Sequence, residues 1–465
     1  MWDAYARGSL VDLTDEPDDL VSASVIARLL LGGNEVEKGF VPAVRLRGAR
    51  ITGRLDVAGG DVECELLLER CVLEEAPRFG NARTRQLRFA DCAMPGFDGG
   101  GLRADGYVSL SGSVIDGQVK LVRAQLLGGF RMNGTRITAP DDRYAFFAGA
   151  LLVEAGMFAR NAEITGGMRM TGSRLTGGLF MEGARLVNPG RIALDGQNIA
   201  VTDAMECGQG FHAEGTVKLR GARIDGTLSF DRAGSMRAPG RVALQLSHAT
   251  VSELILIPSE PIEGIVSMSY ARFGVILDDP DLWPEQLRLT GATYESLRGG
   301  GVTRRSDWVG RDPEGFRPQP YEQLAAWYLK DGNEHLARRT QLLKLRRRRR
   351  TLPWLSRTWG ALLDYTVGYG YRPWLAFGWL AAIVVLGTVV FGEVQPRPLK
   401  EPAERPDFNA LAYVVDLLIP IGAFGQREAW DAVGWTQWLA YGIIASGWIL
   451  ATALIAGVAR VLRPN

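Results

Sequence analysis

Cysteine and histidine are scarce in this chain of 465 residues, which has four cysteines and three histidines. The cysteines form no CxxC pair, and the histidines are scattered along the chain. This scarcity argues against a structural zinc site and against a disulfide framework. The residues concerned are Cys64, Cys71, Cys92, Cys207, His212, His248 and His335.

The chain also has little net charge, because 53 Lys and Arg residues nearly balance 52 Asp and Glu residues. No global field therefore points to nucleic acid as a partner. The first residues carry acidic side chains soon after Met1 and lack an apolar core segment. We therefore expect no cleavable signal peptide and an N-terminal domain that stays in the cytoplasm.

Glycine, by contrast, is abundant at 57 residues, and many glycines belong to an internal repeat with the pattern L-x-G-A-R-I-x-G-x-L. The copy that begins at Val44 recurs at Val217. Apolar positions return every eleven residues, as in Leu46, Val57 and Leu68. Apolar and polar residues alternate within each copy, which indicates short strands with one buried face.

A unit of about 11 residues is too short for a helix and a strand, so two units predict one coil of about 20–22 residues in a parallel β-helix. Glycine suits the corners, where the chain turns with positive φ. We therefore predict a mainly β fold whose N-terminal β-solenoid occupies 44–298 in roughly 12 coils. A β-sandwich is disfavoured because Asn-Gly and Asp-Gly pairs do not separate paired strands at regular intervals.

The sulfur-containing residues fit the same pattern. The cysteines and several methionines fall on or near the buried register of the repeat, so we interpret them as core residues and not as a redox or metal site. The methionines concerned are Met132, Met168, Met170 and Met181.

Other segments are expected on either side of the solenoid. A helical cap is predicted within 1–43, because a solenoid end left open could pair with another chain. Residues 299–318 are rich in Gly, Pro and Arg and predict a linker. A basic helical neck is predicted at 319–372, with a break between two helices at Asp331-Gly332-Asn333.

Five consecutive arginines end the second neck helix. Such a run invites a nucleic-acid interpretation, but an apolar sequence rich in tryptophan follows at once. We therefore interpret the run as a topology signal and as a contact for anionic lipid headgroups. The residues are Arg346, Arg347, Arg348, Arg349 and Arg350.

A membrane module is predicted at 373–465, with spans at about 374–392 and 435–459. The first span carries no charge and would be about 28 Å long as a helix, which is enough to cross the hydrocarbon core. Basic residues dominate before the first span and acidic residues dominate between the spans. The positive-inside rule then predicts a multi-pass protein of the cell membrane with both termini in the cytoplasm.

A third apolar segment, 408–424, is too short to cross the membrane and return, which predicts a re-entrant or interfacial helix. Asp416 in its middle is a functional candidate because a carboxylate in lipid is costly. The alternative is that Asp416 faces water from an amphipathic surface helix. The pore-like candidates are Asp416, Pro420, Gly422, Gly425 and Gln426.

Span, short helix, glycine-containing turn and span is the plan of a two-helix potassium-channel subunit. Residues 421–425 stand at the filter position but lack the Thr-Val/Ile-Gly-Tyr-Gly-Asp run whose carbonyls coordinate ions. Residues 366–370 do match that run, yet they precede the first span. We interpret them as a turn between a helix and the span.

Taken together, the chain resembles bacterial, chiefly actinobacterial, proteins with pentapeptide-like repeats and a C-terminal two-span segment. Members of that family are often labelled membrane-associated oxidoreductases, which is the activity that the resemblance implies. The sequence itself offers no CxxC, no haem or flavin motif and no GxGxxG between a strand and a helix. The resemblance is carried by Pro318-Gln319-Pro320-Tyr321-Glu322-Gln323-Leu324, Gly368-Tyr369-Gly370-Tyr371-Arg372-Pro373 and Asp416-Leu417-Leu418-Ile419-Pro420 with Gly425-Gln426.

The sequence favours a membrane-tethered scaffold or sensing protein without catalysis of its own. Its expected partners are anionic lipids and a protein on the solenoid face, because solenoids bind macromolecules along extended surfaces. A channel-like homo-oligomer gated by the solenoid is one alternative, and an oxidoreductase is another. We assign no catalytic, cofactor-binding or metal residues. A nucleic-acid mimic is disfavoured because Arg and Asp are mixed on the outer face.

Overall fold

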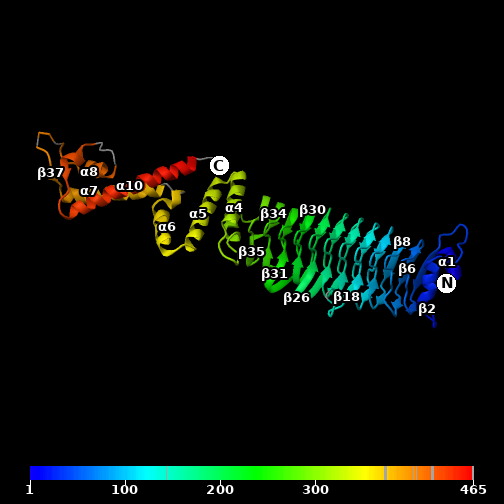
Figure 1. The fold of residues 1–465 in the computed structure, drawn as a ribbon. Coiled ribbons are helices and arrows are strands. Elements are labelled where there is room, and N and C mark those ends of the chain that lie inside the picture. Colours follow the sequence, from blue (N-terminus) through cyan, green and yellow to red (C-terminus); the bar gives the residue numbers. More distant parts are fainter. Residues whose placement is uncertain (143, 371–373, 402, 405, 420–423, 463–465) are drawn as a thin grey trace. The chain divides into compact units, whose positions relative to one another are not determined.

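A computed structural model describes residues 1–142, 144–370, 374–401, 403–404, 406–419 and 424–462. The chain divides into two compact units, Met1–Gln323 and Leu324–Asn465. The first unit is a β-solenoid and the second is helical (Figure 1).

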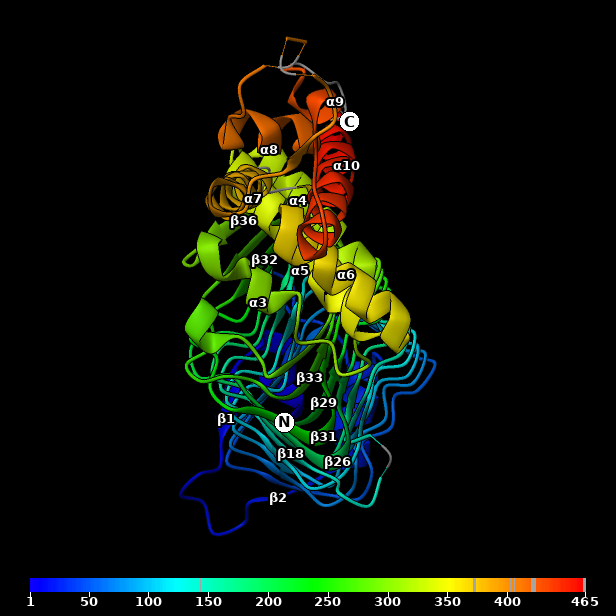
Figure 2. The ribbon, with the colours of Figure 1, turned by 90° about the vertical axis from the view of Figure 1, so that its left-hand side faces the viewer.

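The solenoid stacks short strands in parallel on their neighbours in the next coil. For example, β3 (Ala43–Arg47) pairs in parallel with β6 (Glu65–Glu69), which pairs in parallel with β9 (Leu87–Ala90). Figure 2 looks along the stack, so strands of successive coils overlap. The stack has about 12 turns. The predicted parallel solenoid is confirmed, over 43–299.

The strands form two sheets of 20 and 16 members. Besides β3, β6 and β9, the larger sheet contains β1 (Leu10–Asp12), β5 (Asp61–Val62), β8 (Arg83–Thr84), β12 (Arg103–Ala104), β13 (Val108–Ser109), β16 (Gln125–Leu126), β17 (Phe130–Arg131), β20 (Leu152–Val153), β21 (Met157–Phe158), β24 (Arg174–Leu175), β25 (Leu179–Phe180), β27 (Ala200–Val201), β28 (Met205–Glu206), β30 (Arg223–Ser229), β32 (Thr250–Leu256), β34 (Arg272–Asp278) and β36 (Thr293–Gly299). The smaller sheet contains β2 (Leu20–Ser22), β4 (Arg50–Thr52), β7 (Val72–Leu73), β10 (Ala93–Met94), β11 (Phe97–Asp98), β14 (Val114–Ile115), β15 (Val119–Lys120), β18 (Arg136–Thr138), β19 (Phe146–Phe147), β22 (Glu163–Thr165), β23 (Met168–Arg169), β26 (Arg185–Asp195), β29 (His212–Lys218), β31 (Met236–Gln245), β33 (Glu263–Ser267) and β35 (Gln286–Arg288).

Apolar side chains stack in columns inside the coils. Leu46 lies in register with Leu68, and Leu68 lies in register with Phe89. All three are 0% exposed. Phe89 also meets Phe79 and Phe97, with ring centroids 6.0 and 5.6 Å away. Each such side chain stabilises the fold by roughly 1.5–3 kcal/mol through burial, so the repeat itself supplies the core.

Coil corners turn through the left-handed region, but glycine does not occupy all of them. The corners at Asn81 and Asn198 have φ of 57° and 55°. Asparagine tolerates this conformation better than most residues, because its short polar side chain can bond locally. One coil later, a Cβ at Gly101 or Gly221 would come within 2.3 or 2.4 Å of the Oδ1 of the asparagine below it, so a larger residue there would have to displace that side chain. Both asparagine and glycine therefore serve at left-handed corners, which allows the repeat to vary there.

Two helices and two short strands occupy 1–43. The helices are α1 (Trp2–Arg7) and α2 (Ala23–Leu30), and the α2 residues Ile26 and Leu29 are 0% exposed. Within this predicted helical cap, the second helix begins only at Ala23. The reason is that β2 pairs with β4 of the next coil before the helix starts.

The C-terminal end of the first unit contains three short helical segments. They are η1 (Pro280–Leu282), η2 (Val302–Arg304) and α3 (Arg305–Trp308). Residues 299–318, predicted as a linker, therefore contain ordered turns. The residues Arg305 and Trp308 are buried, with 1% and 2% of their surfaces exposed.

The division between the two units falls within α4 (Pro318–Lys330), and the second unit continues as a series of helices. Both predicted neck helices are present, as α4 and α5 (Glu334–Arg350). The Thr-Val-Gly-Tyr-Gly run lies where α6 ends, and its Gly-Tyr-Gly part forms the turn η3 ahead of α7, as interpreted. The remaining elements are α6 (Trp354–Val367), η3 (Gly368–Gly370), α7 (Trp374–Glu393), β37 (Arg397–Pro398), α8 (Ala410–Leu418), α9 (Gln426–Ala429), β38 (Trp430–Asp431) and α10 (Trp435–Leu462).

Helices α7, α8 and α10 share one apolar core, which includes Phe391, Tyr413, Val414 and Ile443. Among the described residues, α7 alone is long and apolar enough to cross a membrane, and only 17% of its most apolar stretch is buried. The second predicted span corresponds to α10, a helix of 28 residues.

Candidate functional site

Asp416 lies near the end of α8 with 1% of its surface exposed. Its Oδ1 accepts a hydrogen bond of 2.8 Å from the backbone N–H of Phe424. Its Oδ2 accepts one of 2.8 Å from the backbone N–H of Gln426, and the N–H of Arg427 lies 3.4 Å from the same oxygen. The carboxylate therefore fastens the start of α9 to α8.

This geometry corrects one of the two interpretations of Asp416. A residue on the water-facing side of a surface helix would be exposed, and Asp416 is not. A buried carboxylate needs hydrogen-bond donors, and here backbone N–H groups at the start of α9 provide them. Both carboxylate oxygens are engaged in holding the local fold.

Gln426 completes the same cluster and is 4% exposed. Its Nε2 donates to the carbonyl of Asp407 at 2.9 Å, and its Oε1 accepts from the N–H of Asn409 at 3.4 Å. Gly425 caps α9 with a φ of 69°. Pro420 and Gly422 lie outside the described residues. Two of the five pore-like candidates, Asp416 and Gln426, thus meet in one buried polar cluster, and Gly425 adjoins it in an exposed position.

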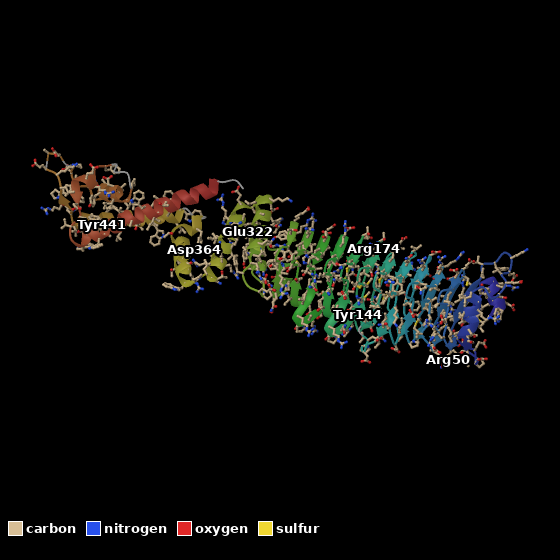
Figure 3. The ribbon with its side chains drawn as sticks, in the orientation of Figure 1. Arg50, Tyr144, Arg174, Glu322, Asp364 and Tyr441 are labelled. Carbon is tan, nitrogen blue, oxygen red and sulfur yellow. The ribbon has the colours of Figure 1, made fainter. Side chains whose placement is uncertain are left out.

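Two of the five arginines bind Asp364 on α6, which Figure 3 labels. Arg346 engages both oxygens, with Nη2 2.9 Å from Oδ1 and Nε 3.0 Å from Oδ2. Arg349 places Nη1 3.2 Å from Oδ2 and donates to the carbonyl of Gly360 at 3.3 Å. The side chain of Asp364 is only 9% exposed. These contacts fasten α5 to α6, because bidentate arginine–carboxylate pairs are both strong and directional.

The five arginines therefore form two groups, according to their positions around the axis of α5. Arg346 and Arg349 are three residues apart and share the face of α5 that meets α6. Within the described part of the chain, Arg347, Arg348 and Arg350 take part in no ion pair, and Arg348 and Arg350 are exposed. Of the five arginines expected to contact anionic lipid, these three are the ones that Asp364 does not hold.

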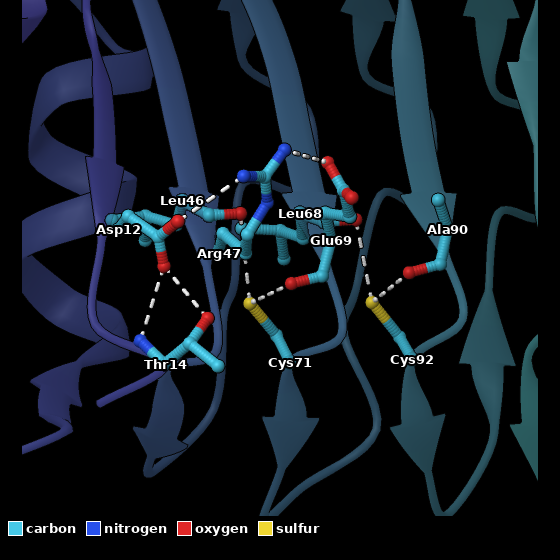
Figure 4. A network of polar contacts seen from close by, with 9 residues as sticks. All are labelled: Asp12, Thr14, Leu46, Arg47, Leu68, Glu69, Cys71, Ala90 and Cys92. Atoms are coloured by element: carbon cyan, nitrogen blue, oxygen red, sulfur yellow. Dashed lines mark hydrogen bonds and ion pairs between the residues drawn. The ribbon is translucent and has the colours of Figure 1, made fainter. Parts of the chain in front are cut away.

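The cysteines lie in the core, as the repeat predicts. All four are buried, and Cys71 and Cys92 stand at equivalent corners of successive coils (Figure 4). Their thiols lie 3.4 Å from the carbonyls of Glu69 and Ala90. Burial raises the pKa of Cys64 and of Cys207, which disfavours a reactive thiolate at these two positions. Within the described residues, no three His, Cys, Asp or Glu side chains are placed to hold a metal ion.

One buried charge pair was missed by the sequence interpretation. Arg305 donates to Asp278 through Nη1 at 2.6 Å, and both side chains are 2% exposed. The indole of Trp283 donates to the same carboxylate at 3.0 Å. The Arg305 guanidinium lies 5.5 and 5.3 Å from the ring centroids of Trp283 and Trp308. The pair is separated by 27 residues, so no local sequence pattern could have revealed it.

Comparison with known proteins yields no relative: no family model, no curated protein and no solved structure matches the chain.

Proposed function

We propose that the chain is a membrane-anchored scaffold whose solenoid presents an extended surface to a protein partner in the cytoplasm. The observation that carries the proposal is the pairing of two features in one chain: a solenoid of about 12 turns and an apolar helix that is largely uncovered. Solenoids bind macromolecules along their long faces, and an apolar helix of this length favours lipid.

The surface of α7 supports the anchor. The core helix of a soluble protein is mostly buried, whereas Phe377, Val385, Leu386 and Val389 are each 60–64% exposed. Such a surface in water would cost about 25 cal/mol for every Å² of apolar area left uncovered. Trp374, at the start of the helix, is 63% exposed and suits the membrane interface.

The orientation follows from the charges around α7. Arg347, Arg348 and Arg350 precede the helix and would each gain about 1 kcal/mol near an anionic membrane surface. In the connection between α7 and α10, acidic residues outnumber basic residues. We propose that α10 is a second span, so that both termini and the solenoid lie in the cytoplasm.

Membrane retention tests the anchor. The wild-type chain should remain with membranes after alkaline carbonate extraction. Replacing Leu386→Arg should sharply reduce the retained fraction, because an arginine near the centre of a span costs about 2.5–3.5 kcal/mol. Leu399→Arg is the matched control, since Leu399 is equally exposed, at 60%, but lies beyond α7. Complete extraction of the wild type would refute the anchor.

Site-specific crosslinking tests the partner. A photo-crosslinking residue can replace Arg174 on β24 of the larger sheet or Arg50 on β4 of the smaller sheet, both exposed and labelled in Figure 3. A scaffold with one binding face should yield the same crosslinked protein repeatedly from one position and little from the other. Repeated absence of any crosslinked partner from both sheets would count against the scaffold.

A channel-like oligomer is the second candidate, and one observation favours it. Helix α8 has only nine residues, about 14 Å of helix, and it packs into the core shared with α7 and α10. A short buried helix between two apolar helices is the plan of a pore subunit. A monomer in detergent that passes no ions in liposomes would exclude this candidate.

The oxidoreductase implied by the resemblance would be supported by a flavin or nicotinamide that copurifies with the chain.

A further inference from the structure

The larger sheet of the solenoid carries a polar groove of about 500 Å³ in the cyan part of the ribbon in Figure 1. It lies over β9, β13 and β17, which are consecutive in the stack. Its lining includes two arginines, two serines, a tyrosine and an asparagine: Arg88, Arg131, Ser109, Ser111, Tyr107 and Asn133.

The register places a small residue between the two arginines. Ser109 pairs with Arg88 on one side and with Arg131 on the other. Since coils are about 4.8 Å apart, the two arginines stand about 10 Å apart with the serine between them. Both arginines are exposed, whereas Ser109 is 5% exposed. The long side chains thus flank a notch whose floor is a hydroxyl.

These arginines differ from others on the solenoid. Arg45 and Arg47 form ion pairs with Glu65 and Glu69 of the next coil, at 2.7 and 3.0 Å. Among the residues that the structure describes, neither Arg88 nor Arg131 has an acidic partner. Arg131 instead lies over the ring of Tyr107, with its guanidinium carbon 4.5 Å from the ring centroid. This cation–π contact holds one guanidinium at the groove without neutralising it.

The acidic member of the lining is Asp91. It stands at a coil corner with a φ of 53°, and its Oδ1 lies over Gly112, where a Cβ would meet it at 1.9 Å. Asp91 therefore occupies the corner and not the notch between the arginines. The lining keeps a net positive charge, which favours an anion.

We propose that this groove binds the phosphate group of a small soluble ligand. A carboxylate is satisfied by one guanidinium fork, whereas two guanidiniums and two hydroxyls match the several oxygens of a phosphate. Ser109 and Ser111 are already within hydrogen-bond distance, at 3.2 Å between their hydroxyl oxygens, so both can turn to one anion. The groove is larger than a phosphate, so the ligand carries a further group. This inference is independent of the scaffold proposal.

Calorimetric titration of the full-length chain in a non-ionic detergent tests the proposal. The probes are inorganic phosphate, a nucleoside monophosphate and the same nucleoside without its phosphate. Both phosphate probes should bind and the nucleoside should not. Replacing Arg88→Gln together with Arg131→Gln removes both guanidinium groups from the groove. Phosphate binding should then weaken tenfold or more, which corresponds to a loss of at least about 1.4 kcal/mol in binding free energy.

The matched control replaces Arg83→Gln together with Arg103→Gln. These arginines are also exposed and also in register on the same sheet, but they do not line the groove. The control removes the same charge and should leave phosphate binding unchanged. Equal weakening in both double variants would mean non-specific attraction and would overturn the proposal. Absence of binding to both phosphate probes, or binding confined to phosphatidic acid vesicles, would overturn it as well.

Discussion

Arg305→Met is expected to destabilise the C-terminal end of the solenoid by about 3–5 kcal/mol, because it leaves a buried carboxylate without its counter-charge. Burial raises the pKa of Asp278, and the guanidinium of Arg305 and the indole of Trp283 oppose that rise. Without Arg305 the full cost of burying the carboxylate would remain. Unfolding in urea, followed by tryptophan fluorescence, measures the change, since Trp283 and Trp308 adjoin the pair.

A neighbouring arginine is the control for this prediction. Arg304 pairs with Asp281 at 2.8 Å, but their side chains are 51% and 78% exposed. An exposed pair contributes little, so Arg304→Met should hardly move the unfolding midpoint. The double change of Asp278→Leu and Arg305→Met should be milder than Arg305→Met alone, because it removes both buried charges. If Arg305→Met behaves like Arg304→Met, the pair does not stabilise this end.

The same pair bears on aggregation. The last coil of the solenoid has no further coil to pair with, and unpaired strand edges can join other chains. Arg305 donates to the carbonyl of Arg298 on β36 at 3.0 Å, which satisfies one backbone group of that strand. Loss of Arg305 is therefore expected to promote self-association as well as unfolding.

The solenoid could be predicted because its signal is repeated. The spacing of Leu46 and Leu68 implied that they occupy equivalent positions, and they do lie in register. The first coil was harder to predict, because β1 joins the larger sheet without any copy of the repeat. Backbone pairing does not require a particular side chain, so sequence alone cannot show where such a stack begins.

The site was predicted less well, for a different physical reason. The arginine run was visible in the sequence. Which of its arginines pair with Asp364 and which remain exposed depends on α6 packing against α5, which the sequence does not reveal. Asp416 was identified as unusual from its apolar surroundings, whereas its anchoring role depends on contacts with the backbone of Phe424 and Gln426. Contacts of this kind follow from tertiary structure and leave no periodic trace in the sequence.

Asp416→Ala is expected to lower the stability of the helical unit by about 2–6 kcal/mol, because the backbone N–H groups of Phe424 and Gln426 would lose their acceptor at roughly 1–3 kcal/mol each. Thermal unfolding in detergent measures the loss, and amide hydrogen exchange should accelerate at Phe424 and Gln426. Asp431→Ala, an exposed carboxylate in the same unit, is the control and should change neither.

The substitution Asp416→Asn distinguishes two roles for this residue: a structural anchor and a carboxylate that binds ions. The amide retains one acceptor oxygen but turns an NH₂ group towards a backbone donor, so an anchor should lose stability and protection at Gln426 even though the side chain keeps its size. A carboxylate needed for ion passage would instead lose conduction in liposomes while the unfolding temperature stayed unchanged. Because both oxygens of Asp416 already accept backbone N–H groups, we expect the first outcome. The second would mean that α8 lines a pore, and it would favour the channel over the scaffold.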